Sequence, residues 1–465
     1  MASELPDFIK ASQPIPQEGR APWYKNTAPA YAGIVLWFVF WQSIVLGAGA
    51  PGGVLSQGVL PALLGLLIGA LLCHFLYYLV PGLLGVKSGR PLYVVGTSTY
   101  GARGGLFMPG FLMGILQFGW IALNAYSVSV LLCKCFGLSA DVPSLSHALI
   151  AAALVILGIF VGMKGIQHVG RVATYLPMIP LVILMILVCK TAGGLGSFKP
   201  ADVGASSASL DFLGVIVAMC TYTVGFFATA GAAGVDMCMN NRHPKDVHLA
   251  GLSGVVLAMF VAGALAILVV AGAYGGGSVT AASKGSLNPV DLLGDLMGEG
   301  NTNTIMILLA IAAFPPICFS GFIAATAMKT TLPKVNPWLS VACGGVVSIV
   351  LAATGAIGKI DIVFAVIVAS FGPVCGAMAA DYLLAGRKWA GPRAGFNPAG
   401  WISWVVGLAV GSVDILAEIP ALEGLKGVIP LPGVAAFIVG FVLYIILAKM
   451  GLATRTIEMP AADVS

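Results

Sequence analysis

Long apolar runs separated by short polar connections fill the chain from residue 29 to residue 449. A helix of about twenty apolar residues is long enough to cross a bilayer core. The runs predict twelve membrane-spanning helices, at about 29–54, 57–83, 106–136, 145–163, 170–190, 212–235, 247–273, 303–328, 337–356, 361–385, 398–416 and 431–449. The pattern therefore predicts an all-α membrane protein with twelve transmembrane helices and polar tails at 1–28 and 450–465.

Two of these segments, the first and the sixth, become rich in glycine. The first reads YAGIVLWFVFWQSIVLGAGAPGG, and the sixth carries Gly225, Gly231 and Gly234. Each helical glycine costs about 1 kcal/mol relative to alanine, so both helices are expected to be broken and to offer backbone groups to a solute. Close packing of a neighbouring helix accounts for the same glycines equally well.

Interrupted spans five helices apart predict two inverted repeats of five helices. The repeats would occupy 29–190 and 210–386, with broken helices one and six, and two additional helices would follow at 398–449.

Composition and charge agree with a membrane protein. Hydrophobic residues make up 59% of the chain and charged residues 9%, which a soluble domain does not need. The net charge of +5 comes from short loops, so no nucleic-acid partner is expected. With the N-terminus inside, 17 of the 23 Lys and Arg residues fall on the inner side, which predicts a multi-pass protein of the cell membrane with both termini cytoplasmic. The bilayer itself is the predicted partner, and the protein is expected to act as a monomer.

Polar and aromatic residues share one face of the third segment. Gln117, Trp120 and Asn124 lie at helical spacing in GFLMGILQFGWIALNAY. Unpaired amides are costly in hydrocarbon, so this stripe faces either a neighbouring helix or a cavity. In a cavity, the indole would stack on a flat ring and the amide would read its edge.

The first and sixth segments supply a second amide and a second aromatic wall. Gln42 follows Phe38 by one helical turn, and Phe226 and Phe227 follow Gly225. Together with the third segment, these residues predict an aromatic sandwich with two amides. Such a site suits a flat, neutral, hydrogen-bonding nitrogen heterocycle.

No acid lies clearly at the centre of a span, so a buried carboxylate is not predicted to carry a coupling proton. His74 is the mid-span histidine; it would act either as a packed, hydrogen-bonded residue or as a proton carrier. None of the nine cysteines forms a CxxC pair, and no HExxH or GxSxG motif is present. The sequence therefore predicts no cofactor, no metal centre and no enzyme.

Four stretches resemble nucleobase:cation symporter family 1, the family of cytosine, purine, allantoin and hydantoin permeases. They are SGRPLYVVGTSTYGARGGLFMPGFLMGILQFGW at 88–120, KGIQHVGRVATYLPMIPLVILMI at 164–186, FGPVCGAMAADYLLAGRK at 371–388 and FNPAGWISW at 396–404. The resemblance implies transport by alternating access through a five-plus-five repeat with two added helices. It also implies ring contacts from Trp120, Asn124 and Gln42.

Two helices depart from the family pattern. Phe226 and Phe227 stand where the best-understood relatives carry a Gly-Trp pair. On the eighth helix, Ala313 and Phe314 replace the hydroxyl pair that holds sodium in the family, and Phe319, followed by Ser320, replaces the substrate-binding Asn. Coupling to sodium of the family's kind is therefore not expected, and coupling to a proton stays open.

The sequence favours a permease for a nucleobase or related planar heterocycle. An amino-acid or amine transporter of the same architecture and a channel are the alternatives that remain.

Overall fold

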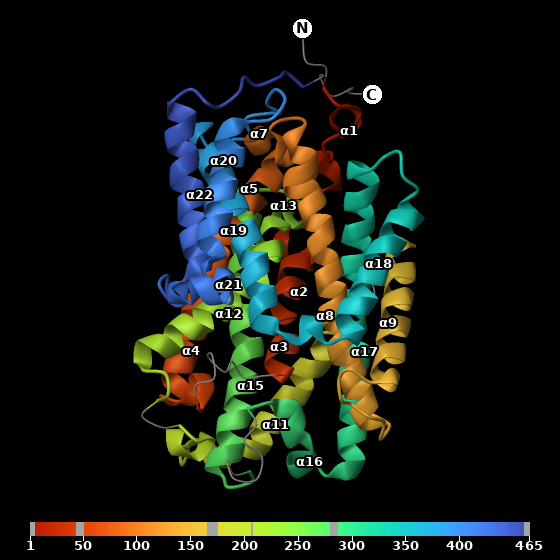
Figure 1. Cartoon of the computed structure of the whole chain (residues 1–465), viewed down its shortest axis with the longest axis vertical. Coiled ribbons are helices and arrows are strands. Elements are labelled where there is room, and N and C mark those ends of the chain that lie inside the picture. The colour runs from red at the N-terminus through yellow and green to blue at the C-terminus, as the bar shows by residue number, and fades with distance from the viewer. Residues whose placement is uncertain (1–4, 43–50, 165–174, 206–207, 280–286, 460–465) are drawn as a thin grey trace.

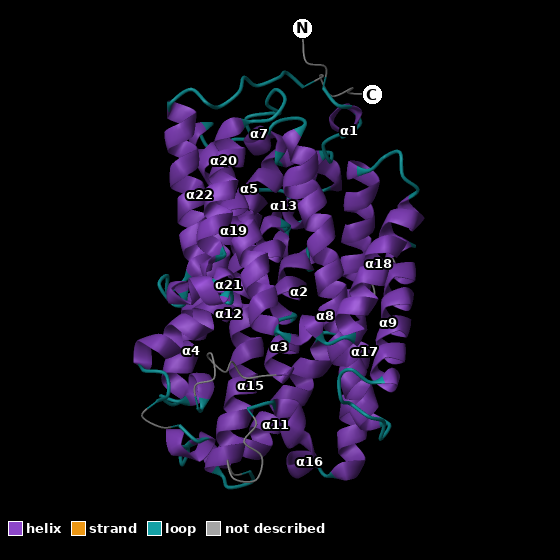
Figure 2. Ribbon diagram, in the orientation of Figure 1, coloured by secondary structure: helices purple, strands orange, loops and turns teal. Residues whose placement is uncertain are grey.

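The computed structural model describes residues 5–42, 51–164, 175–205, 208–279 and 287–459. Within these ranges every regular element is helical, as Figure 2 shows, and the β contacts are two isolated bridges. The membrane-region helices are α2 (Ala28–Ile34), α3 (Trp37–Gln42), α4 (Val59–Leu72), α5 (Leu79–Ser88), α8 (Leu112–Cys135), α9 (Leu145–Met163), α11 (Met178–Leu195), α12 (Phe212–Ala232), α13 (Gly234–Cys238), α14 (Pro244–Ala250), α15 (Ala258–Gly275), α17 (Glu299–Thr331), α18 (Pro337–Ala353), α19 (Ile360–Leu384), α20 (Pro398–Gly411) and α22 (Pro432–Lys449).

Short helices complete the described chain. They are α1 (Asp7–Lys10), α6 (Leu92–Val95), α7 (Thr97–Tyr100), α16 (Pro289–Met297) and α21 (Val413–Leu416), with 3₁₀ turns between them. Three π-helical turns, η5 (Cys73–Tyr78), η6 (Leu106–Phe111) and η8 (Gly251–Leu257), join α4 to α5, lead into α8, and join α14 to α15.

Nine helical stretches in the described residues are long and apolar enough to cross a membrane. Three shorter apolar helices, Ala28–Trp41, Pro337–Ala353 and Pro398–Gly411, accompany them. Each of the twelve predicted segments overlaps one of these helices, which confirms the all-helical membrane fold. Twelve crossings, the division into inverted repeats and the domain bounds stay predictions.

Within its described residues, the first segment is broken between Ile34 and Trp37. Helix α2 ends at Ile34 and α3 begins at Trp37. Between them Phe38 N–H bonds Val35 at 3.0 Å and Val39 N–H bonds Leu36 at 3.2 Å, so the chain passes through tight turns of 3₁₀ type. Gly47 and Gly49 lie outside the described residues.

The sixth segment is also broken, at Ala233, between Gly231 and Gly234. Helix α12 continues through Gly225 and Gly231 to Ala232, and α13 begins at Gly234. A Cβ on Gly225 would lie 2.7 Å from Phe364 Cβ, and one on Gly231 would lie 2.5 Å from Tyr77 Cβ. These two glycines therefore serve close packing of neighbouring helices, and unwinding in the middle of the segment is not observed.

Glycines also bring other helices close together. Gly65 and Gly69 of α4 pack against Met219 and Thr223 of α12. Gly33 of α2 meets Gly254 of η8 backbone to backbone, because a Cβ on Gly33 would lie 2.0 Å from the Gly254 carbonyl oxygen. No side chain therefore separates α2 from η8 at this point.

Both chain ends pack at one end of the bundle, where Leu5 and Ile9 share a small cluster with Ile457 (Figure 1). Beside them Arg393 forms an ion pair of 2.9 Å with Asp381 of α19. The Tyr444 hydroxyl of α22 donates to the same Asp381 oxygen at 2.7 Å, so this buried network joins α19, α22 and the loop before α20.

Candidate binding cavity

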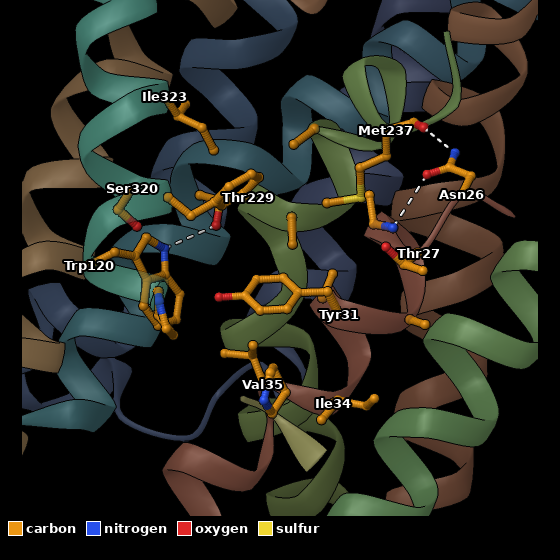
Figure 3. A pocket seen from close by; sticks show the side chains of 18 of the residues that line it. Asn26, Thr27, Tyr31, Ile34, Val35, Trp120, Thr229, Met237, Ser320 and Ile323 are labelled. Atoms are coloured by element: carbon orange, nitrogen blue, oxygen red, sulfur yellow. Dashed lines mark hydrogen bonds between the residues drawn. The ribbon is translucent and has the colours of Figure 1, made fainter. Parts of the chain in front are cut away.

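A cavity of about 530 Å³ lies beside the break in the first segment, among α2, α8, α12 and α17. Its wall includes Tyr31 and Val35 from α2, and Trp120 and Phe226 from α8 and α12. Figure 3 shows the labelled side chains converging on one space from these helices. Exposed Lys25 and Thr27 also line the cavity, so it reaches the surface near the start of α2.

The indole of Trp120 is fixed by three contacts. Its Nε1–H donates to Thr229 Oγ1 of α12 at 3.1 Å, the dashed line beside Trp120 in Figure 3. Phe226 meets it edge to face at 5.5 Å and 86°, and Phe364 of α19 lies at 5.9 Å and 40°. Two neighbouring helices, α12 and α19, therefore hold this ring, which reduces the entropy lost when a guest stacks on it.

In the Asn124 carboxamide, Nδ2 is hydrogen-bonded within the protein and Oδ1 is not. Its Nδ2 donates to the Trp120 carbonyl oxygen at 2.8 Å, one helical turn back. Its buried Oδ1 has no hydrogen-bond partner among the described residues. Because only the NH₂ group can donate to a carbonyl, this contact fixes the amide orientation and leaves Oδ1 as an acceptor. A guest that satisfies Asn124 must therefore present an N–H or O–H group.

Tyr31 is a lining residue that the sequence reasoning missed. Its ring meets Phe319 of α17 at 5.9 Å and 65°. Its hydroxyl is buried and lacks a hydrogen-bond partner in the described part of the chain. Tyr31 lies on α2, two turns before the predicted pair of Phe38 and Gln42 on α3.

Thr229 and Phe364 were missed as well. Local sequence does not single out Thr229, because its role depends on a contact with Trp120 of α8. Phe364 gave no signal, since a single phenylalanine in an apolar run is typical of any packed helix.

The structure brings six of the nine predicted site residues to this cavity: Gln117, Trp120, Asn124, Phe226, Phe319 and Ser320. Gln117 Nε2 donates weakly to Met113 Sδ at 3.4 Å. Figure 3 places Ser320 beside Trp120.

Two other predicted residues, Gly225 and Phe227, are not among the described lining residues. Phe227 is fully buried in the main core, and Gly225 packs against Phe364. Gln42 ends α3, and its side chain lies outside what the structure describes.

The cavity wall holds little charge. Lys25 is the charged residue among the described lining residues, and no carboxylate is among them. At the mouth Asn26 Nδ2 donates to the Met237 carbonyl at 2.6 Å, as Figure 3 shows, which ties the start of α2 to α13. The same Nδ2 donates to Asn241 Oδ1 at 2.6 Å.

The positions that would carry the family's sodium ligands hold no side-chain oxygen. Ala313 is fully buried in the main core, and Phe314 packs in a second core cluster with Ile317. No group of three or more His, Cys, Asp or Glu that could hold a metal occurs in the described ranges. His74 lies buried in η5, with its Nδ1 lacking a bond to any described group.

A second cavity, of about 880 Å³, lies among α12, α19 and the segment between α20 and α22. Asp211, Asp361, Asp414 and Glu418 line it together with Lys426. Phe364 belongs to this wall and also touches Trp120 and Phe226 of the first wall. The walls of the two cavities therefore meet at a phenylalanine ring.

Comparison with known proteins places this arrangement in a known fold. The sequence matches no protein-family model and no curated protein. Among solved structures, the inward-facing conformation of Mhp1 superposes with a TM-score of 0.67 at 16% identity, covering 96% of this chain and 95% of that one. Mhp1, described as a nucleobase-cation-symport-1 family transporter, is also similar in a closed conformation with bromovinylhydantoin bound, with a TM-score of 0.65 at 16% identity and 94% coverage of both chains.

An outward-open, Na⁺-coupled sialic acid symporter gives a TM-score of 0.60 at 12% identity, covering 98% of this chain and 94% of that one. At these identities the likeness establishes the fold rather than the cargo. The chain therefore has the fold of Mhp1 and of other membrane transporters, over nearly its whole length.

Proposed function

We propose that this protein is a secondary active transporter that moves a nucleobase, or a related planar nitrogen heterocycle, across the cell membrane by alternating access. The observation that carries the proposal is the pairing of a fixed indole, Trp120, with the open acceptor Asn124 Oδ1 in one cavity. A flat ring stacks on the indole and donates an N–H group to the amide.

The lining residues would contribute to binding in two ways. Trp120 and Phe226 supply aromatic surface, while Asn124, Gln117 and Ser320 supply polar groups. Gln42, Gly225 and Phe227 stay predicted contributors from the sequence and its family resemblance. With the termini cytoplasmic, as the Lys and Arg distribution predicts, the mouth at Lys25 opens to the cytoplasm and the structure corresponds to an inward-open state.

Charge argues against the amine rival. A protonated amine in a low-dielectric site needs a carboxylate, and no described lining residue supplies one. An amino acid would also bring a carboxylate, for which Lys25 at the exposed mouth is the nearest cation in the wall. A neutral ring needs no counter-ion, so the lining favours the heterocycle.

The proposal also covers the ion whose gradient drives transport. The fold neighbours include a Na⁺-coupled symporter, which makes a coupling cation reasonable for this chain. Because Ala313 and Phe314 offer no side-chain oxygen, we propose that sodium is not bound in the family's way and that a proton is the alternative.

Uptake by proteoliposomes tests the function. Labelled uracil, cytosine, hypoxanthine, hydantoin, leucine and putrescine are offered under separately imposed sodium and proton gradients. Saturable uptake of one of the four rings, lost in Trp120→Ala and Asn124→Ala, is the expected result. Preferred uptake of leucine or putrescine would support the rival carrier, and flux that does not saturate would support a channel.

A further inference from the structure

The hydroxyl group of Tyr31 has no hydrogen-bond partner among the described residues. The residue lines the cavity from α2, and its hydroxyl is buried without a hydrogen-bond partner among the described groups. A buried hydroxyl normally finds a partner, because it loses its bond to water on burial. Figure 3 shows the hydroxyl end of Tyr31 pointing across the cavity toward Trp120.

The ring of Tyr31 is held in place from two directions. Its backbone N–H bonds the Thr27 carbonyl at 2.9 Å, and its carbonyl accepts from Val35 N–H at 3.0 Å, just before the helix breaks. Its face meets Phe319 of α17. Packing therefore fixes the phenol, while nothing in the described protein fixes its hydroxyl proton.

The cavity thus has two unpaired buried polar atoms on separate helices. Asn124 Oδ1 on α8 can only accept, whereas the Tyr31 hydroxyl on α2 can donate or accept. Both residues line the same space beside Trp120. A guest that carries an N–H group and a carbonyl group can satisfy both atoms, whereas a guest with a single polar group leaves one of them unpaired.

We propose that Tyr31 is a specificity-determining residue whose hydroxyl donates to a carbonyl group of the transported ring. The inference rests on the proposed function and adds a substrate contact from α2. A ligand held by Tyr31 and Asn124 links α2 to α8 directly. Sites that use buried hydrogen bonds reject ligands lacking the matching group strongly, because the protein group is then left unpaired.

The test compares Tyr31→Phe with the wild-type protein in detergent, using equilibrium binding of labelled uracil, cytosine, hypoxanthine and hydantoin. Phenylalanine keeps the ring that packs on Phe319 and removes only the hydroxyl. We expect the dissociation constant of the preferred ring to rise about tenfold. Tyr24→Phe is the matched control, since Tyr24 is 66% exposed and is not a lining residue.

A thiocarbonyl analogue of the preferred ring separates a direct contact from a structural effect. Sulfur accepts hydrogen bonds poorly, so wild-type protein should discriminate against the analogue and Tyr31→Phe should lose most of that discrimination. Unchanged thermal unfolding without ligand shows that the variant is folded. Equal affinity of wild type and Tyr31→Phe, or equal discrimination, overturns this inference alone; wild-type protein that binds none of the four rings overturns the proposed function and this inference with it.

Discussion

Trp120 on α8 donates its indole N–H to the hydroxyl of Thr229 on α12 at 3.1 Å. This bond joins the predicted third and sixth helices where both line the cavity. The indole donor is thus used within the protein and is not available to a guest. Stacking, rather than hydrogen bonding, is what Trp120 offers.

Removing the Trp120–Thr229 hydrogen bond should make the indole ring of Trp120 more mobile. In Thr229→Val the indole N–H loses its acceptor, so we expect stability to fall by about 1 kcal/mol and ring affinity to fall several-fold. Thermal unfolding and equilibrium binding measure the two effects. Thr221→Val is the control on the same helix, because the Thr221 hydroxyl bonds only the Val217 carbonyl; equal effects in both variants would contradict the assigned role of Thr229.

Asn124 is predicted to discriminate N–H from N-methyl groups. Asn124→Ala should weaken binding of the preferred ring about tenfold, since the ring N–H loses its acceptor. Wild-type protein should bind the ring methylated at that nitrogen weakly, and Asn124→Ala should change that affinity little. The affinities of both ligands for both proteins form a thermodynamic double-mutant-type cycle, with Asn124→Ala as one change and ligand methylation as the other. If the two losses in binding free energy simply add, Asn124 does not contact that nitrogen.

Replacing external sodium by choline should leave uptake unchanged. A hard cation requires several oxygen ligands, and Ala313 and Phe314 supply no side-chain oxygen. Initial uptake rates into proteoliposomes, with and without a sodium gradient, measure this. A rate that rises steeply with sodium would show that other oxygens bind the ion, the carbonyls beside Pro315 and Pro316 being the first to examine.

The pair Asp381–Arg393 should contribute strongly to stability. The Asp381 carboxylate is 3% exposed and also accepts from Tyr444, so Asp381→Asn leaves the partly buried Arg393, 15% exposed, without its counter-charge. Breaking such a pair costs about 3–5 kcal/mol. Glu418→Gln is the control, because Glu418 and Lys426 are more than half exposed and 3.7 Å apart, and exposed pairs contribute about 0–1 kcal/mol.

Thermal unfolding in detergent compares these two variants with the wild-type protein. Equal midpoints for Asp381→Asn and Glu418→Gln would contradict the importance of the buried network.

The sequence predicted the helices well because each needs about twenty apolar residues, a local property. It also predicted the stripe of Gln117, Trp120 and Asn124, since helical spacing alone puts them on one face. For the glycines of the sixth segment the sequence left unwinding and close packing as equal alternatives. The structure shows that Gly225 lets Phe364 approach and that the helix breaks between Gly231 and Gly234. Glycine in a membrane helix serves packing or unwinding, and only the neighbouring helix decides between them.

Contacts between distant segments account for what the sequence could not predict. Thr229 matters because of Trp120, and Tyr31 matters because of Phe319 and the space beyond it. None of these pairs is visible in local spacing. Gln42, Gly225 and Phe227 stay untested as substrate contacts, and the binding experiments above apply to them equally.

The backbone contact between Gly33 and Gly254 has a mechanical consequence. With no side chain between them to compress or swing aside, any tilting of the half-helix that carries Tyr31 has to drag the π-turn at 251–257 along. The same turn also meets His74, because a Cβ on Gly251 would lie 2.3 Å from His74 Nδ1. A movement of α2 at the cavity would therefore be passed to buried His74 through two close contacts, at Gly33–Gly254 and at Gly251.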